Sequence, residues 1–204
     1  MTKSADVLKM MKDKDVKFVD LRFTDTKGKM QHVTADVSCI DDEVFKDGYA
    51  FDGSSIAGWK SIEASDMLLM LDPTSAHVDP FFAQTTVAIF CDVIEPSTGQ
   101  AYERDPRGIA KKAESYMMSL GIGDKVFFGP EAEFFIFDDV KFSTGMYNTG
   151  FKIDSNELPS NTDTEYEMGN LGHRPRVKSG YSPVPPIDSS QDIRSEMLSG
   201  LTEM

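Results

Sequence analysis

Two stretches of the sequence concentrate side chains that could do chemistry. The first, FDGSSIAGWK at residues 51–60, places Asp52 and the hydroxyls of Ser54 and Ser55 close to the chain's only tryptophan, Trp59. Glycine and serine interrupt both helical and strand periodicity here, so we expect an irregular surface loop, where functional side chains often lie. Such clusters also occur as plain turns closed by a packed indole. The residues alone leave both interpretations open.

The second stretch, GPEAEFF, places Glu131 and Glu133 two positions apart among phenylalanines. On a strand both carboxylates would point to the same face, about 6.6 Å apart. A cation would relieve their repulsion, and the hard ions Mg²⁺ and Mn²⁺ prefer carboxylate oxygens. Such ions assist phosphoryl transfer. The alternative is a solvent-facing strand with two exposed glutamates, and the spacing does not choose between them.

Other chemical signatures are weak. His32, His77 and His173 share no helical or strand-neighbour spacing, so we interpret each as structural or solvent-exposed. The two cysteines, Cys39 and Cys91, are too few and too far apart for a disulfide scaffold or a zinc site built on cysteine pairs. The phosphate-loop and dinucleotide-binding glycine motifs are both absent from the sequence.

The composition argues against two classes of partner. With 34 acidic and 21 basic residues, the net charge is −13. Nucleic acids and anionic membranes attract clustered cations, so we expect neither as a partner. The N-terminal residues carry charge throughout and contain no apolar signal segment, and no apolar run approaches the roughly 20 residues of a membrane span. These features predict a cytoplasmic protein.

The first hundred residues read as a small α+β unit. Ser4 is a candidate cap for a short helix over residues 5–13. Alternating residues at 16–25 and 29–37 predict a hairpin around the turn DTKG, and a second pair of strands is predicted at 66–71 and 85–94. These strands must position the loop that carries Asp52.

We place a domain boundary near residue 103, giving domains at 1–103 and 104–204. A helix is expected to begin there, with Asp105 as its cap, Pro106 as its first residue and Gly121 just after its end. A strand over residues 125–140 would carry the two glutamates. A long loop is expected over 138–191 and a helix over 189–204, where the chain ends.

Four blocks of sequence together resemble bacterial type I glutamine synthetases. They are FDGSSIAGWK…EASDMLLMLDP, RDPR, GPEAEFFIFD and GYSPVPPIDSSQDIRSEM, and the resemblance covers essentially all 204 residues. It implies an α+β chain in which a small β-grasp domain precedes an α/β catalytic domain. It also implies the ATP-dependent ligation of ammonium to glutamate, through a γ-glutamyl phosphate.

The resemblance also implies roles for particular residues. Glu131 and Glu133 match ligands of a pair of Mg²⁺ or Mn²⁺ ions, and Asp52 matches an aspartate that attracts ammonium and takes a proton from it. Ser54 and Ser55 would shape the loop around Asp52. Tyr181 matches a tyrosine on a mobile loop that covers the site. In the family the Asp52 loop reaches the active site of a neighbouring subunit, which implies a homo-oligomer, a dodecamer.

Members of the family continue well beyond residue 204 and carry further metal ligands and most of the ATP pocket there. We therefore expect this chain to be the N-terminal part of such an enzyme and to be inactive alone. Two alternatives are a γ-glutamyl ligase acting on a larger amine and a non-catalytic protein that keeps the fold. Asp52 favours ammonium over the larger amine, and the presence of Asp52, Glu131 and Glu133 argues against the non-catalytic protein.

Overall fold

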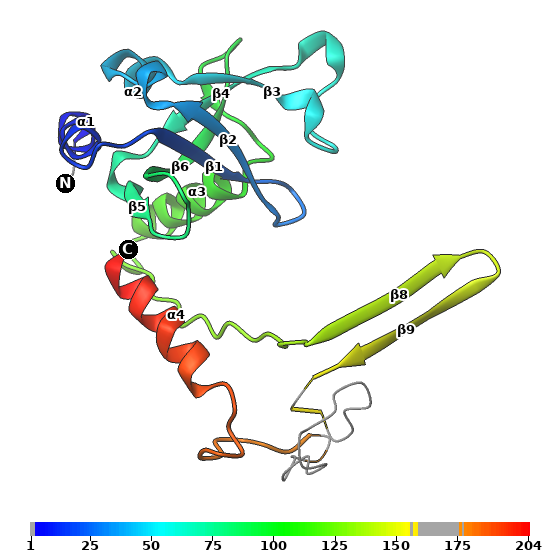
Figure 1. Cartoon of the computed structure of the whole chain (residues 1–204). Coiled ribbons are helices and arrows are strands. Elements are labelled where there is room, and N and C mark those ends of the chain that lie inside the picture. The colour runs from blue at the N-terminus through cyan, green and yellow to red at the C-terminus, as the bar shows by residue number, and fades with distance from the viewer. Residues whose placement is uncertain (1–2, 156, 159–175, 177) are drawn as a thin grey trace. The chain divides into compact units, whose positions relative to one another are not determined.

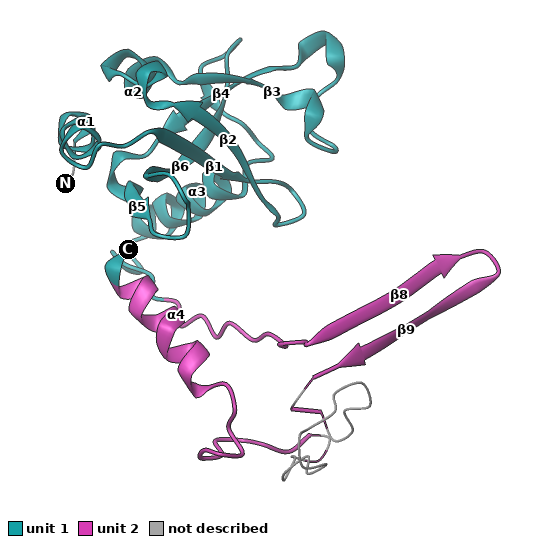
Figure 2. Cartoon of the chain, in the orientation of Figure 1, with its two compact units in different colours: residues 1–127, 203–204 teal, residues 128–202 magenta. Residues whose placement is uncertain are grey.

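The computed structural model describes residues 3–155, 157–158, 176 and 178–204. It divides the chain into two compact units, residues 1–127 with 203–204, and residues 128–202 (Figure 2). The predicted boundary near residue 103 is not tested by this division into compact units, so it stays a prediction. Among the described residues, none of the helices has the length and apolar character that crossing a bilayer requires.

The first unit is built on a seven-stranded sheet (Figure 1). Along its main path the strand order is β2-β1-β6-β4-β3, and β5 and β7 also pair with β6. β1 and β6 run parallel, and the other pairs run antiparallel. The strands are β1 (Phe18–Thr24), β2 (Met30–Asp36), β3 (Tyr49–Asp52), β4 (Asp66–Leu71), β5 (His77–Asp79), β6 (Thr86–Glu95) and β7 (Gln100–Ala101). The predicted hairpin and the second strand pair are confirmed, whereas β3, β5 and β7 were not predicted.

Strand alternation explains the core of this unit. Val19, Leu21 and Phe23 of β1 point to one face and are buried, because successive side chains alternate between the two faces. β4 and β6 contribute the same alternation, and on β6 Ala88 of the opposite face is buried as well. The buried apolar residues of these two strands are Met67, Leu69, Leu71, Val87, Ala88, Ile89, Cys91 and Val93. Burying such side chains is the main favourable term in folding.

Three α-helices accompany the sheet among the described residues: α1 (Ser4–Asp13), α2 (Asp42–Asp47) and α3 (Pro106–Ser119). Four single-turn 3-10 helices lie in the described connections, one of them at Gly53–Ser55 directly after β3. α3 contacts β1 and β6, α2 contacts β4, and α1 contacts α2. The predicted capping of the first helix by Ser4 is wrong. Lys3 occupies the cap position, and its backbone N–H donates to Asp6 Oδ2 at 3.0 Å, while the Ser4 hydroxyl donates to Asp42 Oδ1 at 3.2 Å.

The predicted start and end of α3 are confirmed. Pro106 is its first residue, and Gly121 follows its end with a φ of +67°. Asp105 caps the helix: its carboxylate accepts the backbone N–H groups of Arg107 and Gly108, each at 3.1 Å. The same buried carboxylate accepts the N–H of Val93 on β6 at 3.1 Å. One side chain thus both starts the helix and attaches it to the sheet.

The second unit contains a hairpin of β8 (Asp139–Gly145) and β9 (Asn148–Asp154) and the helix α4 (Gln191–Glu203). The helix was predicted, but the hairpin replaces the start of the long loop expected over 138–191. Its two-residue turn, Met146 and Tyr147, lacks the Asn-Gly or Asp-Gly signature of tight hairpin turns. The expected strand over 125–140 is also wrong for residues 125–138, which form neither helix nor strand.

Candidate functional site

Asp52 is the last residue of β3, where it lies opposite Asp66 of β4. Its Oδ1 accepts the backbone N–H of Ser54 at 2.8 Å and the hydroxyl of Ser54 at 2.6 Å. The hydroxyl bond from Ser54 is the largest of the effects that lower the pKa of Asp52, and the hydroxyls of Ser65 and Ser55 act in the same direction. Asp52 is therefore an exposed carboxylate that is held in its charged form.

Gly53 allows the chain to turn closely off β3. Its N–H donates to the carbonyl of Ser65 at 2.7 Å, and a Cβ at this position would lie 2.5 Å from Cγ of Met67. That separation is far below ordinary van der Waals contact, so a side chain here would displace the core residue Met67. Glycine is thus required by the packing under Asp52.

Trp59 closes the same loop at its other end. Its indole is 5% exposed, and its ring centroid lies 5.6 Å from that of Phe23 and 5.2 Å from that of Tyr102. The indole N–H donates to the hydroxyl of Thr26 at 2.8 Å. The packed indole of the plain-turn interpretation is therefore confirmed. It also means that the loop, which Figure 1 shows in cyan at the end of β3, is attached to the core.

Four residues that the sequence interpretation missed hold this end of the loop. Arg104 donates to the carbonyl of Gly58, and Tyr102 donates its hydroxyl to the carbonyl of Trp59 at 2.9 Å. Lys60 forms an ion pair with Glu95, and its Nζ lies 5.4 Å from the centroid of the Tyr102 ring. Glu95, Tyr102 and Arg104 lie 35 to 46 residues beyond their partners in the loop, so no local pattern could reveal them. They line a shallow pocket of about 380 Å³.

Glu131 and Glu133 lie in the irregular segment 125–138, and both are exposed. The phenylalanines around them are exposed too: Phe128 by 87% and Phe135 by 85%. Because this segment forms no strand, the two carboxylates do not share a strand face. Their oxygens have the donor chemistry that Mg²⁺ and Mn²⁺ prefer, but among the described residues no group of three or more ligating side chains occurs. The two glutamates fit only as part of a larger ligand set.

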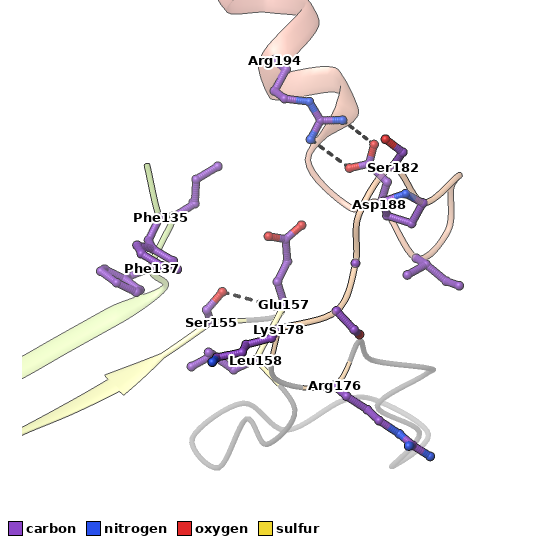
Figure 3. A pocket seen from close by; sticks show the side chains of 15 residues that line it. Phe135, Phe137, Ser155, Glu157, Leu158, Arg176, Lys178, Ser182, Asp188 and Arg194 are labelled. Atoms are coloured by element: carbon purple, nitrogen blue, oxygen red, sulfur yellow. Dashed lines mark hydrogen bonds and ion pairs between the residues drawn. The ribbon is translucent and has the colours of Figure 1, made fainter. Parts of the chain in front are cut away.

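The second unit contains a pocket of about 640 Å³ (Figure 3). On one side Arg194 of α4 forms a two-point ion pair with Asp188, which lowers the pKa of that carboxyl. On another side Glu157 accepts the hydroxyls of Ser189 and Ser190 at 3.2 and 3.0 Å. Apolar lining comes from Phe135, Ile136, Phe137, Leu158, Pro183 and Ile187.

Tyr181 does not line this pocket and is 98% exposed. It is flanked by Gly180, with a φ of +94°, and Ser182, with a φ of +48°. A positive φ costs a serine energy that it does not cost a glycine, so the backbone around Tyr181 is locally strained. The relation of Tyr181 to Asp52 stays a prediction, because they belong to different units.

Two histidines have structural partners, as expected. Nδ1 of His32 lies 2.6 Å from Oδ1 of the buried Asp20, and Nδ1 of His77 lies 2.9 Å from the carbonyl of Ser75. His173 lies outside the described residues. Both cysteines are unpaired, Cys39 exposed and Cys91 buried, which agrees with the absence of a disulfide scaffold.

Comparisons with known families cover both halves of the chain. Residues 15–96 match the family described as "Glutamine synthetase, beta-Grasp domain", and residues 103–204 match "Glutamine synthetase, catalytic domain". These matches confirm the predicted β-grasp domain followed by the start of a catalytic domain. The first match ends at residue 96 and the second begins at residue 103, whereas the compact units divide between residues 127 and 128. The boundary near residue 103 stays a prediction.

Individual proteins with similar sequences or structures include two glutamine synthetases and one protein with another name. The glutamine synthetase of Rhizobium meliloti (strain 1021) is 69% identical over the whole chain, which covers 44% of that relative. A 3-hydroxylaminophenol mutase of Cupriavidus pinatubonensis is 59% identical over 95% of the chain and 41% of the relative. A cryo-EM structure of Plasmodium falciparum glutamine synthetase matches the whole chain and 40% of its own, with a TM-score of 0.82 and 25% identity. The chain spans less than half the length of these curated relatives.

Proposed function

The chain belongs to the glutamine synthetase family, and on this premise we propose that a protein of the relatives' length that contains it ligates ammonium to glutamate. ATP would first phosphorylate the glutamate side chain, and ammonia would then displace the phosphate from the γ-glutamyl phosphate. The proposal rests on the family and on the chemistry of Asp52, an exposed carboxylate that its own loop keeps charged.

Asp52 is the single observation that carries the ammonium role. A carboxylate attracts a small cation only while it is ionised, and the Ser54 hydrogen bonds favour the ionised form. A general base works best when its pKa lies near the working pH. The lowered pKa of Asp52 therefore suits binding ammonium better than taking its proton. Of the two roles implied for this residue, we propose that attraction is the main one.

Glu131 and Glu133 would contribute to a site for two divalent ions, Mg²⁺ or Mn²⁺. When bound, such ions neutralise charge on phosphate oxygens. The exposure of both carboxylates is compatible with ligation by additional groups. Tyr181, on its exposed segment, would cover the reacting groups and limit the access of water, which hydrolyses acyl phosphates.

We further propose a homo-oligomer, a dodecamer, in which the Asp52 loop of one subunit serves the active site of its neighbour. The relative named as a mutase shows that high identity in this part of the chain occurs in proteins with different names. Ligation is favoured here because the Rhizobium meliloti relative, at 69% identity, is named a glutamine synthetase. Neither a larger amine nor a non-catalytic role is favoured by a described contact.

The experiment is an assay for glutamine formation from glutamate, ammonium and ATP. In a protein of the relatives' length, we expect Glu131→Gln and Glu133→Gln each to abolish turnover while unfolding by urea stays unchanged. Each substitution keeps the shape and removes one charge, so it tests ligation rather than packing. Glu114→Gln, at an exposed position of α3, is the matched control and should leave turnover intact.

Undiminished turnover of both variants at saturating Mg²⁺ or Mn²⁺ would identify the pair as ordinary surface glutamates. Absence of glutamine formation by the parent protein would reject the ligase activity itself.

A further inference from the structure

The side chain of Lys60 crosses the base of the Asp52 loop. A Cβ placed on Gly53 would lie 3.5 Å from Cγ of Lys60, so the aliphatic stem of the lysine passes directly beside the residue that follows Asp52. Beyond this contact the ammonium group lies 5.4 Å from the centroid of the Tyr102 ring and pairs with Glu95 at the end of β6. The Lys60 and Glu95 side chains are only 18% and 21% exposed.

This arrangement fixes the loop at two points. Upstream, the N–H of Gly53 is bonded to the carbonyl of Ser65. Downstream, three consecutive residues, Gly58, Trp59 and Lys60, are each bonded to the segment 95–104. Only four residues, 54–57, span the gap, and they include Ser54, the donor to Asp52. A shift of the downstream anchor is therefore transmitted to the groups that orient the Asp52 carboxylate.

The Lys60–Glu95 pair is well suited to hold this anchor. Both charges are largely removed from water, so salt screens them less than an exposed pair. The aromatic face of Tyr102 attracts the same ammonium group, and the hydroxyl of Tyr102 holds the carbonyl of Trp59. Loss of the pair would free the ammonium group of Lys60, and with it the lysine stem beside Gly53 and the backbone next to Trp59.

We propose that Lys60 and Glu95 are positioning residues for Asp52, which set the geometry of its loop without touching a substrate. The proposal rests on the proposed role of Asp52 in binding ammonium. Its consequence is selective: disturbing the pair should weaken the use of ammonium while the use of ATP is unaffected, because the pair acts only through the Asp52 loop.

The first test reads the anchor directly and does not depend on activity. Trp59 is the only tryptophan of the 204-residue chain, so its fluorescence reports on the loop. We expect Glu95→Gln and Lys60→Met, which keep the shape of each side chain, to shift the emission to the red and to increase quenching by acrylamide about threefold as the buried indole becomes accessible. Lys60→Arg keeps the charge and should restore the parent behaviour.

Lys9→Met is the matched control. It breaks the exposed ion pair between Lys9 and Asp13 of α1, at 2.7 Å, by the same chemical change. Exposed pairs contribute little to stability. We expect neither the fluorescence of Trp59 nor the kinetics to change.

The second test is kinetic, in a protein of the relatives' length. Glu95→Gln should raise the KM for ammonium about tenfold, within the roughly hundredfold loss that a displacement of about 1 Å can cause, and leave the KM for ATP unchanged. Unchanged quenching of Trp59 in both Glu95→Gln and Lys60→Met would overturn the proposal. The proposal would also be overturned if quenching of Trp59 increased while the KM for ammonium stayed unchanged, provided that Asp52→Ala itself impairs ammonium use.

A third outcome separates the proposed function from this inference. If Asp52→Ala leaves ammonium use intact, the role of Asp52 is rejected, and with it the positioning role of Lys60 and Glu95. The quenching data then still decide whether the pair anchors the loop.

Discussion

At the scale of single residues, Asp52 and Ser54 form the most specific chemical unit of the chain. One carboxylate oxygen accepts both the backbone N–H and the hydroxyl of Ser54. Asp52, Ser54 and Ser55 could be identified from the sequence because they are neighbours in one loop. The anchors of that loop could not be identified, since Glu95, Tyr102 and Arg104 come near it only through the sheet.

The hydroxyl of Ser54 should set how far the pKa of Asp52 lies below the ordinary aspartate value. We expect Ser54→Ala to raise the pKa of Asp52 toward the ordinary aspartate value of about 3.9, because the strongest hydrogen bond to the charged form is lost. The parent loop stabilises the charged form. The contribution of these hydrogen bonds to the free energy of unfolding is therefore complete above the ordinary pKa of aspartate and is lost as pH falls through the lowered pKa of Asp52. A titration of the carboxyl carbon by NMR measures the shift.

Ser55→Ala is the control for this titration. The Ser55 hydroxyl lowers the pKa of Asp52 less than the Ser54 hydroxyl does, so its removal should shift the pKa less. Equal shifts in the two variants would mean that the loop arrangement differs from the one described.

At the scale of elements, sequence motifs predicted those helix limits that neighbouring residues determine. The limits of α3 were predictable because a cap, a proline and a terminal glycine all lie next to the helix. The strand expected over 125–140 was wrong because a strand exists only when another strand pairs with it, and alternation in one segment does not specify a partner. In the described part of the chain, residues 125–137 belong to no strand ladder. β8 and β9 were missed because their glycines, serines and asparagines resemble loop composition.

Asp105 should make the stability of α3 depend on pH. Burial raises the pKa of this carboxyl even though three backbone N–H groups donate to it. A raised pKa means that its contribution to stability is complete below the ordinary value of about 3.9 and is lost as pH rises through the raised value. We expect the stability advantage of the parent over Asp105→Asn, which does not titrate, to decrease over this range in urea unfolding.

Removing the Asp105 side chain altogether tests its second attachment. Asp105→Ala leaves the N–H of Val93 without its acceptor inside the structure, in addition to losing the helix cap. We expect a loss of about 2–4 kcal/mol in the free energy of unfolding. Asp41→Ala, at the exposed cap of α2, removes one cap bond only and should cost about 1 kcal/mol. Equal losses would contradict the double role of Asp105.

At the scale of the whole molecule, Asp52 and Glu131 belong to different compact units. We predict that these residues meet across a subunit boundary of the proposed homo-oligomer. In a protein of the relatives' length, subunits carrying Asp52→Ala should be mixed with subunits carrying Glu131→Gln, each inactive alone. Some interfaces would then pair an intact Asp52 with an intact Glu131, so glutamine formation should partly return.

Subunit exchange must be demonstrated in that experiment, for example with two affinity tags recovered on one oligomer. If exchange is proven and activity does not return, Asp52 serves its own chain or has no catalytic role.

The polar attachment of α3 has a consequence for how such proteins diversify. The helix lies in the region that matches the catalytic family, yet Arg107 pairs with Asp72 and Asp92 of the small domain, and Lys111 also pairs with Asp92. Genetic recombination between two relatives at residue 103 would separate these charges from their partners. A hybrid whose crossover lies beyond residue 121 would take α3 and the sheet from the same parent protein. Viable hybrids of this lineage should therefore carry α3 with the sheet on which it evolved.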